Sequence, residues 1–380
     1  MRILYYALHD PTLLDTASSV DYFHYQALCE NGFEVKSVGP LKTLPLGIEK
    51  LVARFFQRTG KRFVKYQMSV AWKESQALNR AVRAWKPDAV LTMNMASLVF
   101  YKGEVPAVLS RDTTLCGQQI FWPVYGRVAQ AINTWQEKRA LRNAAYIITN
   151  SQWSKQVIAE YYKQPFEKIG VFILPSALVP DVIPSTIDVE GWKKIEFPLR
   201  VLFVGRDSIP PRKGLNIAIE VTRQLNAAGF PTELTICGTP GQPDEHVQFV
   251  GPFKKSVKEQ LDQYVDLYRR AHILIHPAIF EAAGIVPSEA AAFGTPTITN
   301  DVGGLATTVA DGKSGLVLPK WSPPEAYVEA IVRLIQDPDE YYALCRKTRL
   351  RYERELNWDV TGKWLAGMMR EIAEIGKRSG

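Results

Sequence analysis

Two glutamates stand eight residues apart in the second half of the chain, next to a strongly apolar run. Glu281 and Glu289 belong to the segment 276–296, which we interpret as a strand, a loop that ends at Gly284, and a helix with Pro287 in its first turn. Each glutamate also has an ordinary explanation. Glutamate near the third helical position caps helices in general, and Glu281 could be a solvated loop residue.

The same segment offers backbone groups for an anion. The N–H groups of Gly284, Ile285 and Val286 would point out of the predicted helix N-terminus. Phosphate is favoured there because unsatisfied N–H groups and the helix dipole both attract negative charge. The pattern therefore predicts a phosphate-binding position beside the two carboxylates.

Positive side chains follow another strand. Gly205 and Arg206 come at the end of an apolar run, and Arg212 and Lys213 precede the next predicted helix. Such positions face the crevice where doubly wound sheets bind ligands. Fixed cations there suit a leaving diphosphate, and they would neutralise its developing charge without a metal. The alternative is a set of solvated surface cations.

The elements that must position these residues alternate along the whole chain. Apolar runs of strand length are separated by stretches with helical spacing, and hairpin signals are few. This alternation predicts parallel sheets covered on both faces. The proline-rich segment 175–198 interrupts the pattern and is the predicted domain boundary.

Composition excludes several classes of protein. The chain has 380 residues, of which 46% are hydrophobic and 22% charged, as in ordinary soluble proteins. Its four cysteines form no CxxC pair, which argues against a zinc or redox site. Neither GxGxxG nor GxxxxGK[ST] occurs, so dinucleotide oxidation and P-loop phosphoryl transfer lack support. No apolar stretch is long enough to span a bilayer, and the N-terminus is interpreted as a strand.

The net charge of +7 is concentrated in the first half, above all in residues 41–66. Bulky apolar residues alternate there with cations, among them Arg54, Arg58, Lys61 and Arg62. A basic amphipathic element of this kind is typical of a membrane-surface anchor. The alternative is a lid helix whose apolar side packs on the domain. Nucleic acid is disfavoured because no reader motif accompanies the charge.

The segment around the glutamates resembles the Glu-x7-Glu signature of glycosyltransferase family 4, which comprises retaining enzymes of the GT-B fold. Residues 294–304 and 311–316 continue the likeness, which is strong over 199–320. The resemblance implies that Glu281 binds hydroxyls of the donor sugar and Glu289 the ribose. It also implies that the loop with Phe253 borders the nucleobase.

The implied fold is α/β, with two doubly wound Rossmann-like domains. We expect an acceptor-side domain over residues 1–180 and a domain that binds the nucleotide sugar over 181–357. A helix over 358–380 is expected to return to the first domain, as in the family.

Some positions depart from the family pattern. The loop before Lys213 is about two residues longer, so that either Arg212 or Lys213 could take the phosphate; Lys213 is preferred because it directly precedes a glycine. The loop after the first strand lacks the family's glycines and offers Ser18 and Ser19 instead, where plain capping is the ordinary explanation. In the family's His-Asp pair, Arg111 replaces the histidine before Asp112, and it could bind an anionic acceptor group.

These features together predict a retaining, metal-independent glycosyltransferase that needs no cofactor. The expected donor is a UDP-hexose, with a GDP-sugar second, and Arg206, Lys213 and Glu281 are the expected catalytic residues. The acceptor would be a saccharide, lipid-linked if the protein docks peripherally on the cytoplasmic face of a membrane. The alternatives are a nucleotide-sugar epimerase of the same architecture and a non-catalytic protein that binds nucleotide sugar or lipid.

Overall fold

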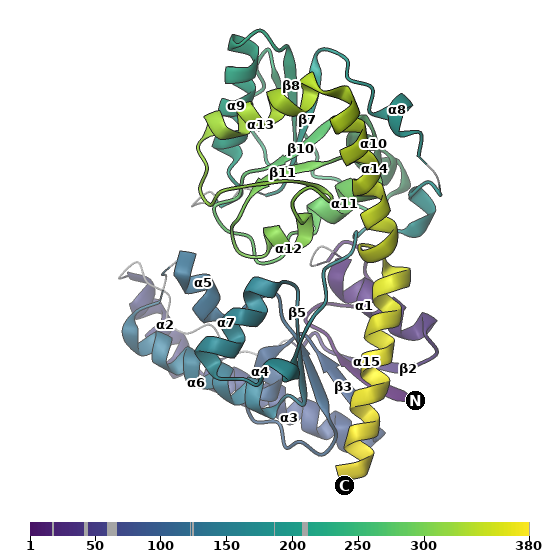
Figure 1. Ribbon diagram of the computed structural model, residues 1–380. Coiled ribbons are helices and arrows are strands. Elements are labelled where there is room, and N and C mark those ends of the chain that lie inside the picture. The colour runs from purple at the N-terminus through teal and green to yellow at the C-terminus, as the bar shows by residue number, and fades with distance from the viewer. Residues whose placement is uncertain are drawn as a thin grey trace. The chain divides into compact units, whose positions relative to one another are not determined.

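The chain forms two compact units. Unit 1 comprises Met1–Phe172 and Gly362–Gly380, and unit 2 comprises Ile173–Thr361. The computed structural model describes residues 1–16, 19–41, 45–58, 67–121, 123, 125–185, 187–206 and 212–379. Figure 1 shows the ribbon from the N-terminal strand to the C-terminal helix.

Unit 1 is built on a parallel six-stranded sheet with the order β2-β1-β3-β4-β5-β6. Its strands are β1 (Arg2–Tyr6), β2 (Glu34–Val38), β3 (Ala89–Thr92), β4 (Ala107–Ser110), β5 (Tyr146–Thr149) and β6 (Ile169–Val171). Its helices are α1 (Val20–Glu30), α2 (Gly47–Arg58), α3 (Met68–Trp85), α4 (Met95–Leu98), α5 (Leu115–Phe121), α6 (Arg127–Asn143), α7 (Gln152–Tyr162) and the 3-10 helix η2 (Phe166–Lys168).

The central strands of unit 1 are buried on both faces. In β1, Leu4 and Tyr6 pack into the core cluster that also contains residues of α3, α4, α6 and α7. Tyr5 points to the opposite face, where its hydroxyl donates to Asp21 of α1 at 2.8 Å. Because successive strand residues alternate between faces, helices must cover both sides. This explains the nearly continuous apolar runs in the sequence.

Unit 2 repeats the plan with the strand order β12-β11-β10-β7-β8-β9, again all parallel. Its strands are β7 (Leu199–Val204), β8 (Thr232–Cys237), β9 (Val247–Val250), β10 (Ile273–His276), β11 (Thr297–Asn300) and β12 (Gly315–Leu318). Its helices are η3 (Pro180–Val182), α8 (Val189–Trp192), α9 (Leu215–Ala227), α10 (Lys258–Arg270), α11 (Val286–Ala292), α12 (Leu305–Val309), α13 (Pro324–Gln336) and α14 (Pro338–Glu355).

The central strand β7 separates two hydrophobic cores. Val201 and Phe203 belong to the cluster that contains residues of α9, α13 and α14. Leu202 and Val204 belong to the cluster on the other face, formed with α10 and α11. Figure 1 shows the sheet of unit 2 and the helices around it. The α/β class with two doubly wound units, predicted from the sequence, is confirmed.

The last helix, α15 (Trp358–Ser379), begins in unit 2 and ends in unit 1. In unit 2, the indole N–H of Trp358 donates to the carbonyl of Ser176 at 3.0 Å. In unit 1, Arg370 donates to the carbonyl of Asn31 at 2.7 Å, and the ring of Trp364 lies 5.7 Å from that of Phe172. The return of the C-terminal helix to the first unit is therefore confirmed.

A buried lysine ties the end of α10 to the core of unit 2. Lys193 is fully buried. Its ammonium group donates at 2.8–3.0 Å to the carbonyls of Tyr268, Arg269 and Ala271 and to the hydroxyl of Thr295. Four acceptors on one donor group fix the C-terminal turn of α10 against the segment just before β11.

We predict that Lys193→Met lowers the free energy of unfolding by about 3 kcal/mol, because the buried acceptors would lose their donor. Burial lowers the pKa of Lys193 to about 7, against about 10.4 in an unfolded chain. The unfolded state therefore binds more protons above pH 7, and wild-type stability should rise toward pH 9. Denaturant unfolding at pH 7 and pH 9 measures both effects.

The matched control is Lys194→Met, since Lys194 is exposed and forms an ion pair with the exposed Glu196, at 3.2 Å. It should unfold like the wild type at both pH values. A Lys193→Met variant with wild-type stability and an unchanged pH slope would contradict the role given to the amino group of Lys193.

Candidate functional site

The loops after β7 and β10 touch backbone to backbone in unit 2. Gly214 has a left-handed conformation with φ of 79°, and a Cβ atom there would lie 1.9 Å from the carbonyl oxygen of Pro277. The N–H of Ile279 donates to the carbonyl of Arg212 at 2.8 Å. Only glycine permits this approach, which brings Lys213 beside the loop that carries Glu281.

Lys213 and Glu281 form an ion pair between the Nζ and Oε2 atoms. Their side chains are only 14% and 16% exposed. Burial raises the pKa of Glu281, but the charge of Lys213 and the nearby His276 lower it by more, so the pKa lies well below its usual range. Glu281 is therefore a carboxylate at neutral pH.

His276, the last residue of β10, lies under this pair. Its Nε2 atom is 3.8 Å from the Oε2 atom of Glu281, and its side chain is fully buried. Neither ring nitrogen has a hydrogen-bond partner among the described residues. Burial lowers the pKa of His276, so the ring is neutral at pH 7. It contributes a dipole beside the carboxylate without adding a second positive charge.

The backbone of Glu281 is also held from the other side. Gly304 donates its N–H to the carbonyl of Glu281 at 2.9 Å. A Cβ atom on Gly303, whose φ is 56°, would lie 2.0 Å from that carbonyl oxygen. The Gly-Gly pair after β11 thus fixes the position of the carboxylate.

Gly205, just after β7, lies beside Lys213. A Cβ atom on Gly205 would lie 3.5 Å from the Cγ atom of Lys213, so the lysine side chain runs along this glycine. The hydroxyl of Thr239 donates to the carbonyl of Gly205 at 2.6 Å. Arg206 follows and is exposed, with no ion pair to any described residue. The guanidinium of Arg206 therefore remains available to a ligand at the carboxyl end of β7.

The amides before α11 are not used by the helix itself. Glu289 donates its N–H to the carbonyl of Ile285 at 3.1 Å, which is the first helical bond of this turn. The N–H groups of Gly284, Ile285 and Val286 precede that bond, as expected at a helix start. Gly284 adopts φ of 82°, which turns the chain from Glu281 into the helix.

Glu289 is almost completely buried, with 1% of its side chain exposed. The hydroxyls of Tyr264 and Tyr268 each donate to its Oε2 atom at 2.7 Å. The ammonium of Lys255 donates to its Oε1 atom at 2.6 Å. Both oxygens of this carboxylate are therefore occupied by protein groups. Phe253 is half-buried near this cluster, with its ring 6.3 Å from that of Tyr264.

The residues expected on the acceptor side lie in unit 1. Arg111 follows β4 and is half-buried, with its Nη2 atom 3.9 Å from the carboxylate of the exposed Asp112. Ser19 stands at the N-cap of α1, yet its hydroxyl donates to the carbonyl of Leu14 at 2.6 Å and does not cap the helix. The capping explanation is therefore wrong for Ser19. Ser18 lies outside the described residues.

Part of the basic run forms helix α2. Arg54 is exposed on this helix, and Arg58 is its last residue. Lys61 and Arg62 lie outside the described residues. Within the described ranges, no helix combines the length and the apolar character that crossing a membrane would require.

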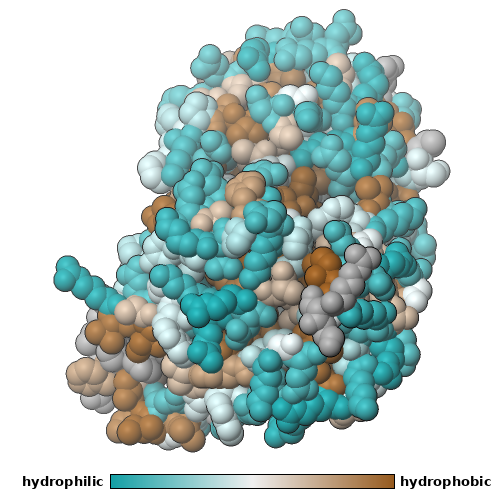
Figure 2. Space-filling model, turned by 60° about the horizontal axis from the view of Figure 1, so that its bottom comes forward, coloured by the Kyte–Doolittle hydropathy of each residue, from teal (hydrophilic) through white to brown (hydrophobic). Residues whose placement is uncertain are grey.

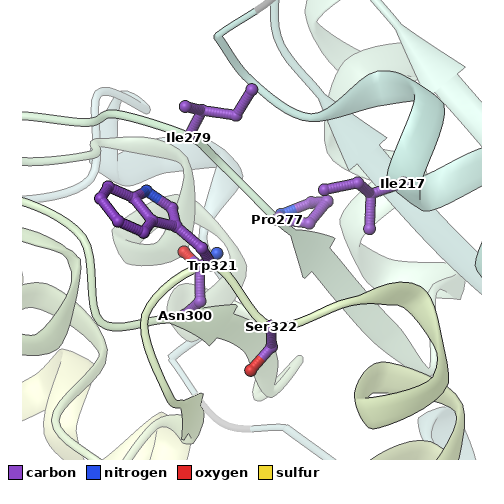
Figure 3. A pocket seen from close by; sticks show the side chains of 6 residues that line it. All are labelled: Ile217, Pro277, Ile279, Asn300, Trp321 and Ser322. Carbon is purple, nitrogen blue, oxygen red and sulfur yellow. The ribbon is translucent and has the colours of Figure 1, made fainter. Parts of the chain in front are cut away.

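An open, mostly apolar hollow lies beside the loop that carries Glu281. Its volume is about 430 Å³, and Figure 3 shows the six side chains around it: Ile217, Pro277, Ile279, Asn300, Trp321 and Ser322. Trp321 has a left-handed φ of 59° and is 61% exposed. The carboxyl ends of β10 and β11 thus border both this hollow and the Lys213–Glu281 pair.

The acidic pair Asp337 and Asp339 has a structural explanation. Asp337 accepts the N–H of Glu340 at 3.0 Å and so caps α14. In the part of the chain that the structure describes, no group of three or more potential ligands is arranged to hold a metal ion.

Four residues near the glutamates were missed in the sequence. They are His276, Lys255, Tyr264 and Tyr268. The two tyrosines are four residues apart on α10, and this spacing puts them on one face of a helix. That signal was available, but only the fold shows that the face points to Glu289.

Comparisons with known proteins agree with the geometry. Residues 186–351 match the family described as Glycosyl transferases group 1, and residues 24–172 match Glycosyltransferase Family 4. A D-inositol 3-phosphate glycosyltransferase from Corynebacterium glutamicum is 28% identical over 62% of this chain and 59% of that protein. The chain thus spans less than two thirds of this relative's length.

Solved structures share the fold over nearly the whole chain. A sucrose-phosphate synthase from Thermosynechococcus elongatus superposes with a TM-score of 0.71 at 20% identity, covering 98% of this chain and 99% of the other. The Anabaena protein Alr3699/HepE was solved in complex with UDP-glucose. It superposes with a TM-score of 0.63 at 15% identity, covering 98% of this chain and 100% of the other. These likenesses establish the GT-B architecture. Because the two family matches cover most of both units, the chain belongs to glycosyltransferase family 4.

Proposed function

We propose that this protein is a retaining, metal-independent glycosyltransferase that moves a hexose from a nucleoside diphosphate sugar to a saccharide acceptor. The observation that carries this proposal is the buried Lys213–Glu281 pair, held by Gly214 and Gly303 at the carboxyl edge of the unit 2 sheet. Glu281 accepts hydrogen bonds from sugar hydroxyls in this scheme. Lys213 and Arg206 stabilise the departing diphosphate.

The chemical step is a front-face substitution. The acceptor hydroxyl attacks the anomeric carbon from the face on which the nucleoside diphosphate leaves. The bond between that carbon and the phosphate oxygen breaks, its electron pair goes to the phosphate, and the same oxygen takes the acceptor's proton. The amides of Gly284, Ile285 and Val286 add donors for the growing negative charge. Arg111, Asp112, Ser18 and Ser19 are proposed to contact the acceptor.

A UDP-sugar is the first proposed donor and a GDP-sugar the second, with Glu289 on the ribose and Phe253 near the base. The complex of Alr3699/HepE with UDP-glucose supports this choice. A nucleotide-sugar epimerase or a non-catalytic binding protein would use the same pocket. Release of nucleoside diphosphate from a panel of nucleotide sugars, with and without acceptor saccharides, separates these functions.

We predict that Glu281→Ala and Lys213→Ala each reduce turnover about a hundredfold, the loss expected for one stabilising contact in a preorganised site. The matched control is Lys258→Ala, because Lys258 is an exposed cation whose ion pair is with Asp262 of its own helix. Steady-state release of nucleoside diphosphate is the measurement. Nearly full turnover in either site variant would remove that residue from the mechanism.

Glu289→Ala should mainly weaken donor binding.

Activity should persist in excess chelator, because side chains and backbone amides supply the positive charge in this mechanism. The measurement is turnover in EDTA after dialysis against the same chelator. Lost activity that manganese or magnesium restores would contradict a metal-free reaction.

The acceptor is proposed to be lipid-linked, with α2 docked on an anionic membrane. Ile48, Leu51 and Phe55 lie on one side of α2 and are 71%, 66% and 66% exposed. Figure 2 shows hydrophobic side chains gathered at the lower left, the side on which Figure 1 draws α2. A lid helix would bury this side, so its exposure favours the membrane. Lys50 and Arg54 stand exposed on the same helix.

We predict that the protein sediments with anionic liposomes and much less at high salt, since each cation near the surface contributes about 1 kcal/mol. Replacing Arg54, Arg58, Lys61 and Arg62 with Gln should leave the protein in solution. Replacing Ile48, Leu51 and Phe55 with Ser should abolish the residual binding at high salt. If all three proteins sedimented equally, the membrane proposal and the lipid-linked acceptor would both be refuted.

A further inference from the structure

Both oxygens of the Glu289 carboxylate accept hydrogen bonds from protein groups. Its Oε2 atom accepts from the hydroxyls of Tyr264 and Tyr268, and its Oε1 atom accepts from the ammonium of Lys255. With 1% of its side chain exposed, Glu289 is shielded from bulk water. Hydrogen bonds to an ionised carboxylate are about twice as strong as neutral ones.

The two oxygens are held very differently. Tyr264 and Tyr268 are both buried, and their hydroxyls also lie 2.8 Å from each other. Burial raises the pKa of each tyrosine well above its usual value, so both stay protonated donors. Lys255, in contrast, stands on the loop before α10, and its flexible side chain is 15% exposed. Lys255 can therefore leave Oε1 without a rearrangement of the buried tyrosines.

Lys255 is secured by more than this ion pair. Its ammonium also donates to the carbonyl of Ala177 at 2.9 Å and lies 5.4 Å from the centre of the Tyr264 ring. A ligand that replaces Lys255 on Oε1 displaces a cation that keeps other partners nearby. Donors on the ligand therefore have to compensate for the ion pair that is broken.

We infer that Lys255 occupies, in the empty enzyme, the position on Glu289 that the ribose hydroxyls of the donor take, so that Lys255 sets how strongly the site selects for a ribose. This inference rests on the proposed role of Glu289 in the donor site. A nucleotide with both ribose hydroxyls displaces Lys255 from Glu289. The ion pair between Lys255 and Glu289 is then replaced by hydrogen bonds from the hydroxyls to the same carboxylate. A nucleotide without them leaves Lys255 in place. The ribose hydroxyls therefore add little net affinity while Lys255 is present.

The test compares UDP with 2′,3′-dideoxy-UDP, and GDP with its dideoxy counterpart, by isothermal titration calorimetry. In the wild type the two affinities of each pair should lie within about threefold. In Lys255→Met, no lysine competes for Oε1. The hydrogen bond from the ribose hydroxyls to Oε1 then contributes fully to the binding affinity. The preference for the ribonucleotide should then rise about tenfold or more, as for a hydrogen bond to a charged group.

Comparing two ligands on one variant removes the general effect of losing a positive charge near a diphosphate. Lys254→Met is the matched control, because Lys254 is an exposed cation on the same loop and does not contact Glu289. It should keep the wild-type ratio. Lys255→Gln, neutral but able to donate, should fall between the wild type and Lys255→Met. Circular dichroism checks that each variant is folded.

An unchanged ratio in folded Lys255→Met, with UDP or GDP still bound, would overturn this inference alone. A ratio that falls would also overturn it, because Lys255 would then help to hold the ribose. If neither nucleotide bound to any of the proteins, the proposed function would fail and the inference with it.

Discussion

The close approach of three loops around Glu281 is the constraint on which the site in unit 2 depends. Gly214 and Gly303 both have left-handed conformations, and each lies where a Cβ atom would strike a carbonyl oxygen, that of Pro277 or that of Glu281. With these contacts the loops after β7, β10 and β11 position one another. The Lys213–Glu281 pair then forms on a backbone that needs little rearrangement when a ligand binds.

The two glutamates of segment 276–296 lie in different surroundings. Glu281 pairs with one lysine and keeps 16% of its side chain exposed, which leaves room for the contact with a sugar hydroxyl proposed above. Glu289 is enclosed by two tyrosines and a lysine. Each carboxylate thus carries its own ammonium before any ligand enters. The guanidinium of Arg206, at the carboxyl end of β7, is exposed.

Much of the fold was predictable because alternation in the sequence directly reflects strands and helices. Both sheets are parallel, as the alternation predicted, and the last helix returns to unit 1, as the resemblance implied. Partners of buried polar groups were not predictable, because they depend on which helix face meets which strand. Periodicity located the apolar side of α2, but it could not show that this side stays exposed.

Unit 1 is discontinuous in the sequence, since Gly362–Gly380 completes a unit that begins at Met1. During synthesis the ribosome releases all of unit 2 before this helical segment emerges. The contacts of Trp364 and Arg370 with unit 1 therefore form last, after the continuous unit has had time to fold. Until then the sheet of unit 1 lacks part of its cover, and its apolar surface is open to chaperones or to aggregation.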